Sequence, residues 1–273
     1  MRAWSLAHLT VLDLPPPEVI ETAHQAGYTH AGLRLLPAAP GGVAYDLMTN
    51  KPLLRETRAR LAATGIAVFD LEIIRLGPGF TLDPVLSVLD TGALLDARAV
   101  LVAGDDPDFA RLTANYAAFC TAAAARGLTA DIEFMPWTEV PDIASAQRLV
   151  AAAGTPANAG ILVDALHYAR SPGGPEAVAA LPGSWLHYAQ LCDAPAAIPP
   201  TRDELISDAR TNRLAPGEGG IDLAGLLRAL PPGLPLSIEI PNHQRARARG
   251  PRGWAADCLR AAQQVVAAAG VSS

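Results

Sequence analysis

Short apolar runs alternate with stretches of helical periodicity along the whole chain. A continuous run such as residues 66–74 is typical of a strand that is buried on both faces, as in a parallel sheet. Helical stretches follow the runs, and glycines such as Gly65 and Gly127 stand where two of these helices should end. The predicted strands are residues 4–8, 29–35, 66–74, 99–103, 128–134, 160–164, 185–192 and 236–240. The predicted helices are residues 15–24, 52–64, 83–96, 106–126, 142–153, 175–180, 203–210, 221–230 and 254–269.

This order of elements predicts an α/β fold with a parallel sheet covered by helices. Eight strand–helix units in 273 residues favour one closed (β/α)8 TIM barrel over an open, doubly wound sheet. A GxGxxG fingerprint after the first strand, which would favour the open sheet, is missing. No linker divides the chain. We therefore predict a single barrel domain over residues 1–273, with a polar insertion after strand seven at about residues 199–220.

Composition narrows the class of protein. The formal net charge of −6 argues against a protein that mainly binds nucleic acid. No apolar run approaches the ~20 residues that a membrane helix needs, and the N-terminus lacks the apolar core of a signal peptide. The three widely spaced cysteines do not form a disulfide framework, so we expect reduced thiols and a cytoplasmic protein. Lys51 is the only lysine and lies on no late strand, which argues against a Schiff-base aldolase.

Polar residues interrupt the strand predicted over residues 185–192. His187 and Gln190 stand inside this otherwise apolar run, and a buried polar group left unpaired costs roughly 1–3 kcal/mol. Three other predicted strands carry a carboxylate near their ends, at Glu133, Asp164 and Glu239. Partners are therefore expected for these polar groups.

The C-terminal strand ends of a (β/α)8 barrel meet at one face, where such enzymes hold their active sites. Glu133, Asp164, Gln190 and Glu239 should therefore converge there. Three carboxylates without a cation would repel one another and take up protons. We predict a divalent metal site, and an all-oxygen ligand set favours Mn²⁺ or Mg²⁺ over Zn²⁺, with Co²⁺ also acceptable. The alternative is that each acid pairs with an arginine or caps the next helix.

Five segments together resemble the sugar phosphate isomerase/epimerase family, whose fold is the xylose-isomerase-like TIM barrel. They are Ile132-Glu-Phe-Met-Pro-Trp137, Val163-Asp-Ala-Leu-His167, His187-Tyr-Ala-Gln-Leu-Cys-Asp193, Pro216-Gly-Glu-Gly-Gly-Ile-Asp222 and Ile238-Glu-Ile-Pro241. The resemblance covers essentially the whole chain. It implies that Glu133, Asp164, Gln190 and Glu239 are the metal ligands. Many members have histidine as the third ligand, so Gln190 is more similar to the branch of hydroxypyruvate isomerase and inosose dehydratase.

The resemblance also implies catalytic roles. Glu133 and Glu239 would exchange protons on opposite faces of an enediolate. His167 matches a family histidine close to the metal, and Arg202 matches a position that reaches the substrate. The expected partner is a small, polyhydroxylated molecule, and arginines near the predicted strand ends also suit an anionic one. The assembly that the resemblance implies is a homodimer or homotetramer.

Other residues are candidates for substrate contact on their own chemistry. Arg34 and Arg75 follow strands two and three and could bind a carboxylate or phosphate bidentately, although Glu72 could pair with one of them. Trp137 could line a pocket or only pack. The histidines His8 and His187 have either a substrate-contacting or a structural role. The arginine-rich residues 245–249 could cover the pocket, but such a run is more often a solvated loop.

Four functions are compatible with these features. The leading hypothesis is a metal-dependent isomerase or epimerase that enolises a small hydroxyketone, keto-sugar or hydroxy-keto acid. The alternative is a metal-dependent dehydratase of an inosose or dehydroshikimate type of substrate. An endonuclease IV-like DNA repair enzyme shares the barrel, but it needs a histidine-rich zinc cluster and a basic groove. A non-catalytic barrel, or one subunit of a larger enzyme, is the fourth.

Overall fold

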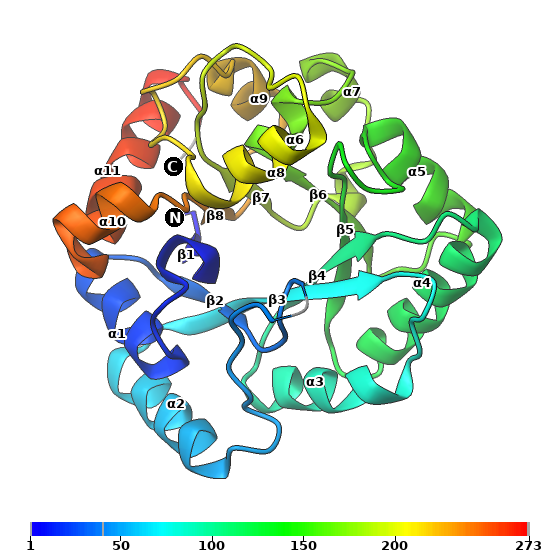
Figure 1. Cartoon of the computed structure of the whole chain (residues 1–273), viewed down its shortest axis with the longest axis horizontal. Coiled ribbons are helices and arrows are strands. Elements are labelled where there is room, and N and C mark those ends of the chain that lie inside the picture. Colours follow the sequence, from blue (N-terminus) through cyan, green and yellow to red (C-terminus); the bar gives the residue numbers. More distant parts are fainter. Residues whose placement is uncertain (1, 40, 272–273) are drawn as a thin grey trace.

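The computed structural model describes residues 2–39 and 41–271, so residues 1, 40, 272 and 273 of the predicted domain lie outside it. Eight parallel strands pair in sequence order and close into a barrel, as Figure 1 shows, which confirms the predicted fold. The strands are β1 (Trp4–Leu6), β2 (His30–Arg34), β3 (Ala67–Leu76), β4 (Ala99–Gly104), β5 (Thr129–Glu133), β6 (Ala159–Asp164), β7 (Ala189–Leu191) and β8 (Leu236–Ile238).

Helices surround the barrel, and most of them cover its outer face (Figure 1). They are α1 (Pro16–Ala26), α2 (Lys51–Thr64), α3 (Asp83–Leu94), α4 (Phe109–Ala124), α5 (Ile143–Ala152), α6 (Ala165–Ala169), α7 (Pro175–Ala179), α8 (Arg202–Thr211), α9 (Leu223–Ala229), α10 (His243–Arg249) and α11 (Pro251–Ala268), with 3-10 helices η1 (His8–Val11) and η2 (Gly183–Trp185). Side-chain caps fix several of their starts: Asn50 accepts the N–H of Leu53, and Asp142 forms a capping box with Ser145. Within the described residues, no helix is both long and apolar enough to cross a bilayer.

The strand predicted over residues 185–192 is much shorter in the structure. Trp185 and Leu186 donate their N–H groups to Pro182 and Gly183, so local turns satisfy this backbone and pairing begins only at Ala189. The strand predicted over residues 4–8 likewise stops at Leu6.

Two helices lie where the sequence did not predict them. The carboxylate of Asp164 accepts the N–H groups of Leu166 and His167 and so starts α6 directly after β6. The side chain of Asn242 accepts the N–H of Arg245 and starts α10, where we had expected a solvated loop or a cover for the pocket. Both caps depend on one short polar side chain, which sequence periodicity does not register.

Side chains alternate between the two faces of the barrel wall. On β4, Val100 and Val102 pack outward in the main core with the helices, whereas Leu101 belongs to a smaller apolar cluster with Phe69 and Tyr188. This inner cluster fills part of the barrel interior. It provides an apolar floor beneath the polar side chains of the upper strand ends.

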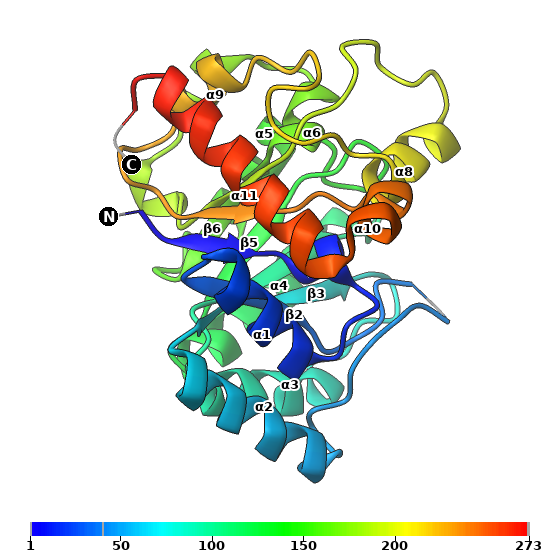
Figure 2. The ribbon, with the colours of Figure 1, turned by 90° about the vertical axis from the view of Figure 1, so that its left-hand side faces the viewer.

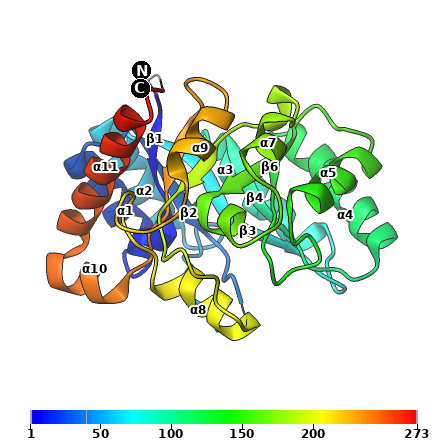
Figure 3. The same ribbon diagram turned by 90° about the horizontal axis from the view of Figure 1, so that it is seen from above.

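The two ends of the barrel differ. Both termini lie at one end, whereas α8, α10 and the loop after β2 lie at the other, as Figures 2 and 3 show from two directions. This second end is where the strands finish. It is the end at which a TIM barrel places its active site.

The insertion that carries α8 returns to the barrel through Asp193. One carboxylate oxygen of Asp193 accepts the N–H groups of Gly217 and Gly219, and the other accepts those of Ala194 and Ile221. A Cβ at Gly219 would lie 2.3 Å from Asp193 Oδ1, so only glycine permits this approach. The predicted insertion is therefore present, and its glycine-rich end has a structural role.

Candidate active site

A cavity of about 260 Å³ opens at the end of the barrel that carries α8. Its lining combines acids, arginines and apolar side chains, and it includes seven of special interest: Arg34, Arg75, Glu133, Trp137, His167, Arg213 and Glu239. A space of this size suits one small molecule. Six of these seven residues were among the predicted site residues, and Arg213 was not.

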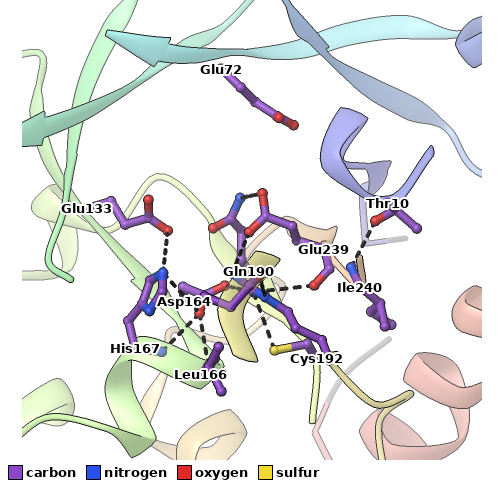
Figure 4. A network of polar contacts seen from close by, with 12 residues as sticks. Thr10, Glu72, Glu133, Asp164, Leu166, His167, Gln190, Cys192, Glu239 and Ile240 are labelled. Atoms are coloured by element: carbon purple, nitrogen blue, oxygen red, sulfur yellow. Dashed lines mark hydrogen bonds and ion pairs between the residues drawn. The ribbon is translucent and has the colours of Figure 1, made fainter. Parts of the chain in front are cut away.

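The four predicted metal ligands do come together. Asp164 and Gln190 are register partners on β6 and β7, and the Nε2 of Gln190 donates to the Oε1 of Glu239 at 3.1 Å. Figure 4 shows Glu133 facing the same centre from β5. All four side chains are almost completely buried. Convergence from strands five to eight is thus a property of the fold, as expected from the sequence.

His167 completes this group from α6. Its Nε2 lies 3.7 Å from Glu133 Oε1 and 3.9 Å from Asp164 Oδ1 (Figure 4). Glu133, Asp164 and His167 offer ligand atoms that all lie within 4.8 Å of one another, so they could hold a metal ion. Burial lowers the pKa of His167 to about 4, and the imidazole is therefore neutral at physiological pH.

Arg213 enters the acid cluster from the insertion. Its Nη1 lies 2.6 Å from Asp164 Oδ2 and its Nη2 lies 2.9 Å from Glu239 Oε2. Asp164 also caps a helix, so the alternative of arginine pairing or capping holds for Asp164, and arginine pairing holds for Glu239. Among the described residues, Glu133 and Gln190 neither pair with an arginine nor cap a helix.

Burial and mutual repulsion shift the proton affinities of the acids. Burial, reinforced by the charges of Glu239 and Asp164, raises the pKa of Glu133 well above its usual range. Burial also raises the pKa of Glu239 to about 7, although the guanidinium of Arg213 opposes the shift. Asp164 is the exception, because Arg213 and its helix cap outweigh its burial and lower its pKa. The cluster therefore combines one firmly ionised acid with two that hold protons readily.

Two oxygen atoms of the proposed ligands lack hydrogen-bond partners. Glu133 Oε1 and Gln190 Oε1 are buried and make no hydrogen bond within the described structure. Buried polar atoms normally have partners, so these two oxygens call for a ligand. Oxygen ligands with one imidazole suit a divalent cation. The residues present therefore fit a metal ion.

Arg34 is held in place by Glu72 and by His8, a predicted candidate for substrate contact. Its Nη2 lies 2.9 Å from Glu72 Oε2, which confirms that Glu72 pairs with an arginine. His8 accepts the backbone N–H of Arg34 at its Nδ1 and approaches the carbonyl of Leu14 with its Nε2. With both ring nitrogens engaged and no exposed surface, His8 supports Arg34 and does not line the cavity.

Arg75 and Arg210 lie on the cavity wall near Arg34. Arg75 forms an ion pair with Asp105. Arg210, on α8, has no carboxylate partner among the described residues. Burial, together with the charges of Arg75 and Arg34, lowers the pKa of Arg210. Positive charge therefore accumulates on this wall of the cavity.

Of the predicted substrate contacts Trp137, Arg202 and His187, only Trp137 lines the cavity. Trp137 lines the cavity and contacts His167 edge to face, with ring centroids 5.0 Å apart. Arg202 is exposed and donates to the carbonyl of Trp137, outside the lining of the cavity. His187 Nδ1 lies 2.6 Å from Asp131 Oδ1, away from the cavity. The structure thus gives Arg202 and His187 partners within the protein, and we do not retain them as substrate contacts.

The two arginines of the insertion, Arg210 and Arg213, were not singled out from the sequence. Arg213 stands three residues before the motif that begins at Pro216, and that proximity is the one sequence signal that could have identified it. The arginine-rich residues 245–249 do not cover the cavity: Arg245 pairs with Glu218, and Arg249 pairs with Asp257.

Comparison with known proteins identifies the fold family. Residues 20–262 match the family described as xylose isomerase-like TIM barrel. Two curated relatives are 3-dehydroshikimate dehydratases. The one from Pseudomonas aeruginosa is 36% identical over 142 residues, which are 50% of this chain and 22% of the relative. The one from Pseudomonas putida is 34% identical over 139 residues, which are 50% of this chain and 21% of the relative. The match thus spans about a fifth of the length of these relatives.

Solved structures agree with the fold. A xylose isomerase-like TIM barrel/4-hydroxyphenylpyruvate dioxygenase fusion protein superposes with a TM-score of 0.79 at 25% identity, over 98% of this chain and 43% of that one. The IOLI protein with a bound zinc atom superposes with a TM-score of 0.73 at 15% identity, over 98% of both chains. A D-allulose 3-epimerase from Methylomonas sp. superposes with a TM-score of 0.67 at 16% identity, over 97% of this chain and 98% of that one. The chain belongs to the xylose isomerase-like TIM barrel family.

Proposed function

We propose that this protein is a divalent-metal-dependent dehydratase that acts on a small cyclic hydroxyketone bearing a carboxylate, of the dehydroshikimate type. The single observation that carries the proposal is a cavity lined both by buried acids that hold protons readily and by Arg210, which has no carboxylate partner among the described residues. The two curated dehydratase relatives support the choice of reaction, although they share only half of this chain.

The metal would be held by Glu133, Asp164, Gln190 and Glu239, with His167 beside them. Mn²⁺, Mg²⁺ and Co²⁺ suit the oxygen donors, and the imidazole also permits Zn²⁺. A bound cation would acidify the C–H next to a ketone and stabilise the negative charge that develops on the carbonyl oxygen.

The chain's own residues supply the proton chemistry. In the dehydration, one carboxylate removes the proton next to the ketone, the carbon–oxygen bond to the β-hydroxyl breaks, and an acid returns a proton to the leaving oxygen to form water. Glu133 and Glu239 both line the cavity, and both have a raised pKa, so one can be protonated while the other is ionised. They are therefore proposed as the acid and the base.

The arginine wall would bind the substrate carboxylate. Arg210 is the best candidate for this contact, since it faces the cavity without a carboxylate partner among the described side chains. Arg34 and Arg75 would add to the positive potential, although Glu72 and Asp105 already engage them. A guanidinium binds a carboxylate with two parallel hydrogen bonds, which would orient the ring above the acids.

Isomerisation or epimerisation is the second candidate. It needs acids on two sides of one carbon, and Glu133 on β5 and Glu239 after β8 approach the cavity from different strands. The D-allulose 3-epimerase shares the fold. Binding to nucleic acid is not part of either proposal, and a dimeric or tetrameric assembly stays a prediction.

One experiment separates the two reactions. Purified protein loaded with Mn²⁺ is incubated with 3-dehydroshikimate, and the ultraviolet absorbance of an aromatic dihydroxybenzoate is followed; parallel incubations with keto-sugars are analysed for epimers. Aromatisation is the expected result. Epimerised keto-sugar without aromatisation would favour the second candidate, and no reaction with either substrate class would contradict both.

A further inference from the structure

Arg213 places a fixed positive charge between two of the proposed metal ligands. Its guanidinium contacts Asp164 Oδ2 and Glu239 Oε2, and its Nε donates to the carbonyl of Ala209 at 2.8 Å. The side chain is only 2% exposed, so water screens this charge poorly. Arg213 is therefore the counter-ion of Asp164 and Glu239.

A metal at the same carboxylates would lie close to this guanidinium. Arg213 contacts Oδ2 of Asp164 and Oε2 of Glu239, which leaves Asp164 Oδ1 and Glu239 Oε1 on the side of His167 and Gln190 for a metal. The two cations would still repel each other across these carboxylates in a site that excludes water. The remaining proposed ligand atoms, Glu133 Oε1 and Gln190 Oε1, have no partner that a metal would have to displace. Competition would therefore concern two ligands of the four.

The backbone of Arg213 is held by contacts that do not involve its side chain. The backbone N–H of Arg213 donates to Pro241, and bridges join Asn212 to Asn242 and Asp193 to Leu214 on either side of it. The side chain, in contrast, lines the open cavity. The guanidinium can thus leave the carboxylates without unfolding the insertion.

We propose that Arg213 is an internal cation that competes with the divalent metal for Asp164 and Glu239. The inference rests on the proposed metal dependence. Arg213 stabilises the acid cluster when no metal is bound, and repulsion between the two cations should move its guanidinium away from at least one carboxylate when metal binds. The metal affinity of the protein is consequently lower than the same ligands would have without the arginine.

Calorimetric titration of the metal-free protein with Mn²⁺ tests this competition. The variants are Arg213→Met and Arg213→Lys, and Arg202→Met on α8 is the matched control for loss of one arginine outside the cluster. We expect Arg213→Met to bind Mn²⁺ about tenfold or more tightly than wild type, because close charge pairs are strongly coupled in buried sites. Its metal-free form should also unfold at a lower temperature, so that Mn²⁺ raises its Tm by more. Arg213→Lys should lie between, and Arg202→Met should match wild type.

Equal or weaker Mn²⁺ binding by folded Arg213→Met would overturn the inference. If that variant does not fold, the Arg213→Lys titration and a crystal structure of the Mn²⁺-loaded wild type take its place. In that crystal structure, Arg213 should have left Asp164 or Glu239. Retention of both ion pairs beside bound metal would refute competition.

Wild type that takes up no Mn²⁺ would contradict the proposed function instead. Mn²⁺ binding by Arg213→Met alone would then still support the competition, and binding by neither protein would overturn both.

Discussion

Arg213 Nη1 lies 2.6 Å from Asp164 Oδ2, and the two side chains are 2% and 0% exposed. Asp164 ends β6, whereas Arg213 belongs to the insertion that follows β7, so this ion pair ties the insertion to the barrel. A buried pair is weak evidence for net stability, but removal of one partner leaves a charge without compensation. The pair therefore makes the cluster sensitive to substitution at either residue.

Asp164→Ala should lose bound metal and destabilise the protein. The substitution removes a proposed ligand, the partner of Arg213 and the cap of α6, and leaving a buried charge unpaired costs about 3–5 kcal/mol. Asp164→Asn is the matched control, because its amide oxygen can still cap α6. Metal analysis after gentle purification and urea unfolding measure the two effects. Wild-type metal content in Asp164→Ala would contradict the proposed ligand set.

Glu239→Gln should abolish turnover and leave the fold intact. Glutamine keeps the shape and the contact with Gln190, but it cannot transfer a proton; loss of a general acid or base lowers kcat by about 10²–10⁴-fold. Glu218→Gln, an exposed residue paired with Arg245, is the control and should keep full activity. Circular dichroism checks the fold. Undiminished kcat in Glu239→Gln would refute the proposed mechanism.

Substitutions of Gln190 test whether its uncharged amide is a metal ligand. We expect Gln190→His to retain metal, with an altered preference among Mn²⁺, Mg²⁺ and Zn²⁺ and with impaired turnover, because imidazole favours softer cations than an amide oxygen does. Gln190→Ala should bind metal more weakly, since it removes an oxygen that has no other partner in the described structure. If the metal affinity of Gln190→Ala equals that of wild type, Gln190 is a structural amide.

The stability of the metal-free protein should respond to the protonation of Glu239. The folded-state pKa of about 7 lies above the unfolded value of 4.5, so the folded state binds more protons between these values. The contribution of Glu239 is therefore complete below pH 4.5 and declines as pH rises through about 7, by up to about 1.4 kcal/mol for each pH unit. Denaturant unfolding from pH 5 to 8 measures this decline.

Glu239→Gln is the reference for that measurement. The buried histidines His8 and His167 have lowered pKa values, so their contribution to stability rises with pH, whereas that of Glu239 falls. Both proteins contain these histidines, so comparing the two isolates the effect of Glu239. Wild type should lose stability relative to the variant as pH rises. A constant difference across the range would show that Glu239 does not titrate there.

Arg210→Ala should weaken the binding of carboxylate substrates. A charge-assisted hydrogen bond contributes about 1.5–3 kcal/mol, so KM should rise by roughly ten- to a hundredfold with a smaller change in kcat. Arg202→Ala is the control: it lies on the same helix, but its guanidinium contacts the carbonyl of Trp137 outside the cavity. An equal effect of both substitutions would indicate general disturbance of α8.

The sequence by itself determined the barrel and the convergence of Glu133, Asp164, Gln190 and Glu239. Apolar runs alternating with helices leave a parallel barrel as the fold, and in such a barrel the strand ends must meet at one face. Local signals also identified Glu72 as the partner of an arginine, without specifying Arg34.

Only the tertiary structure decided the charge balance of the site. Arg213 and Arg210 reach the cavity because Asp193 fastens the return of the insertion and Arg170 binds Asp208 of α8, contacts between residues far apart in the chain. His8 and His187 were candidates for substrate contact, yet their ring nitrogens contact Arg34 and Asp131. Periodicity reports which face of a strand or helix is buried, whereas the partner of a polar group depends on where distant segments meet.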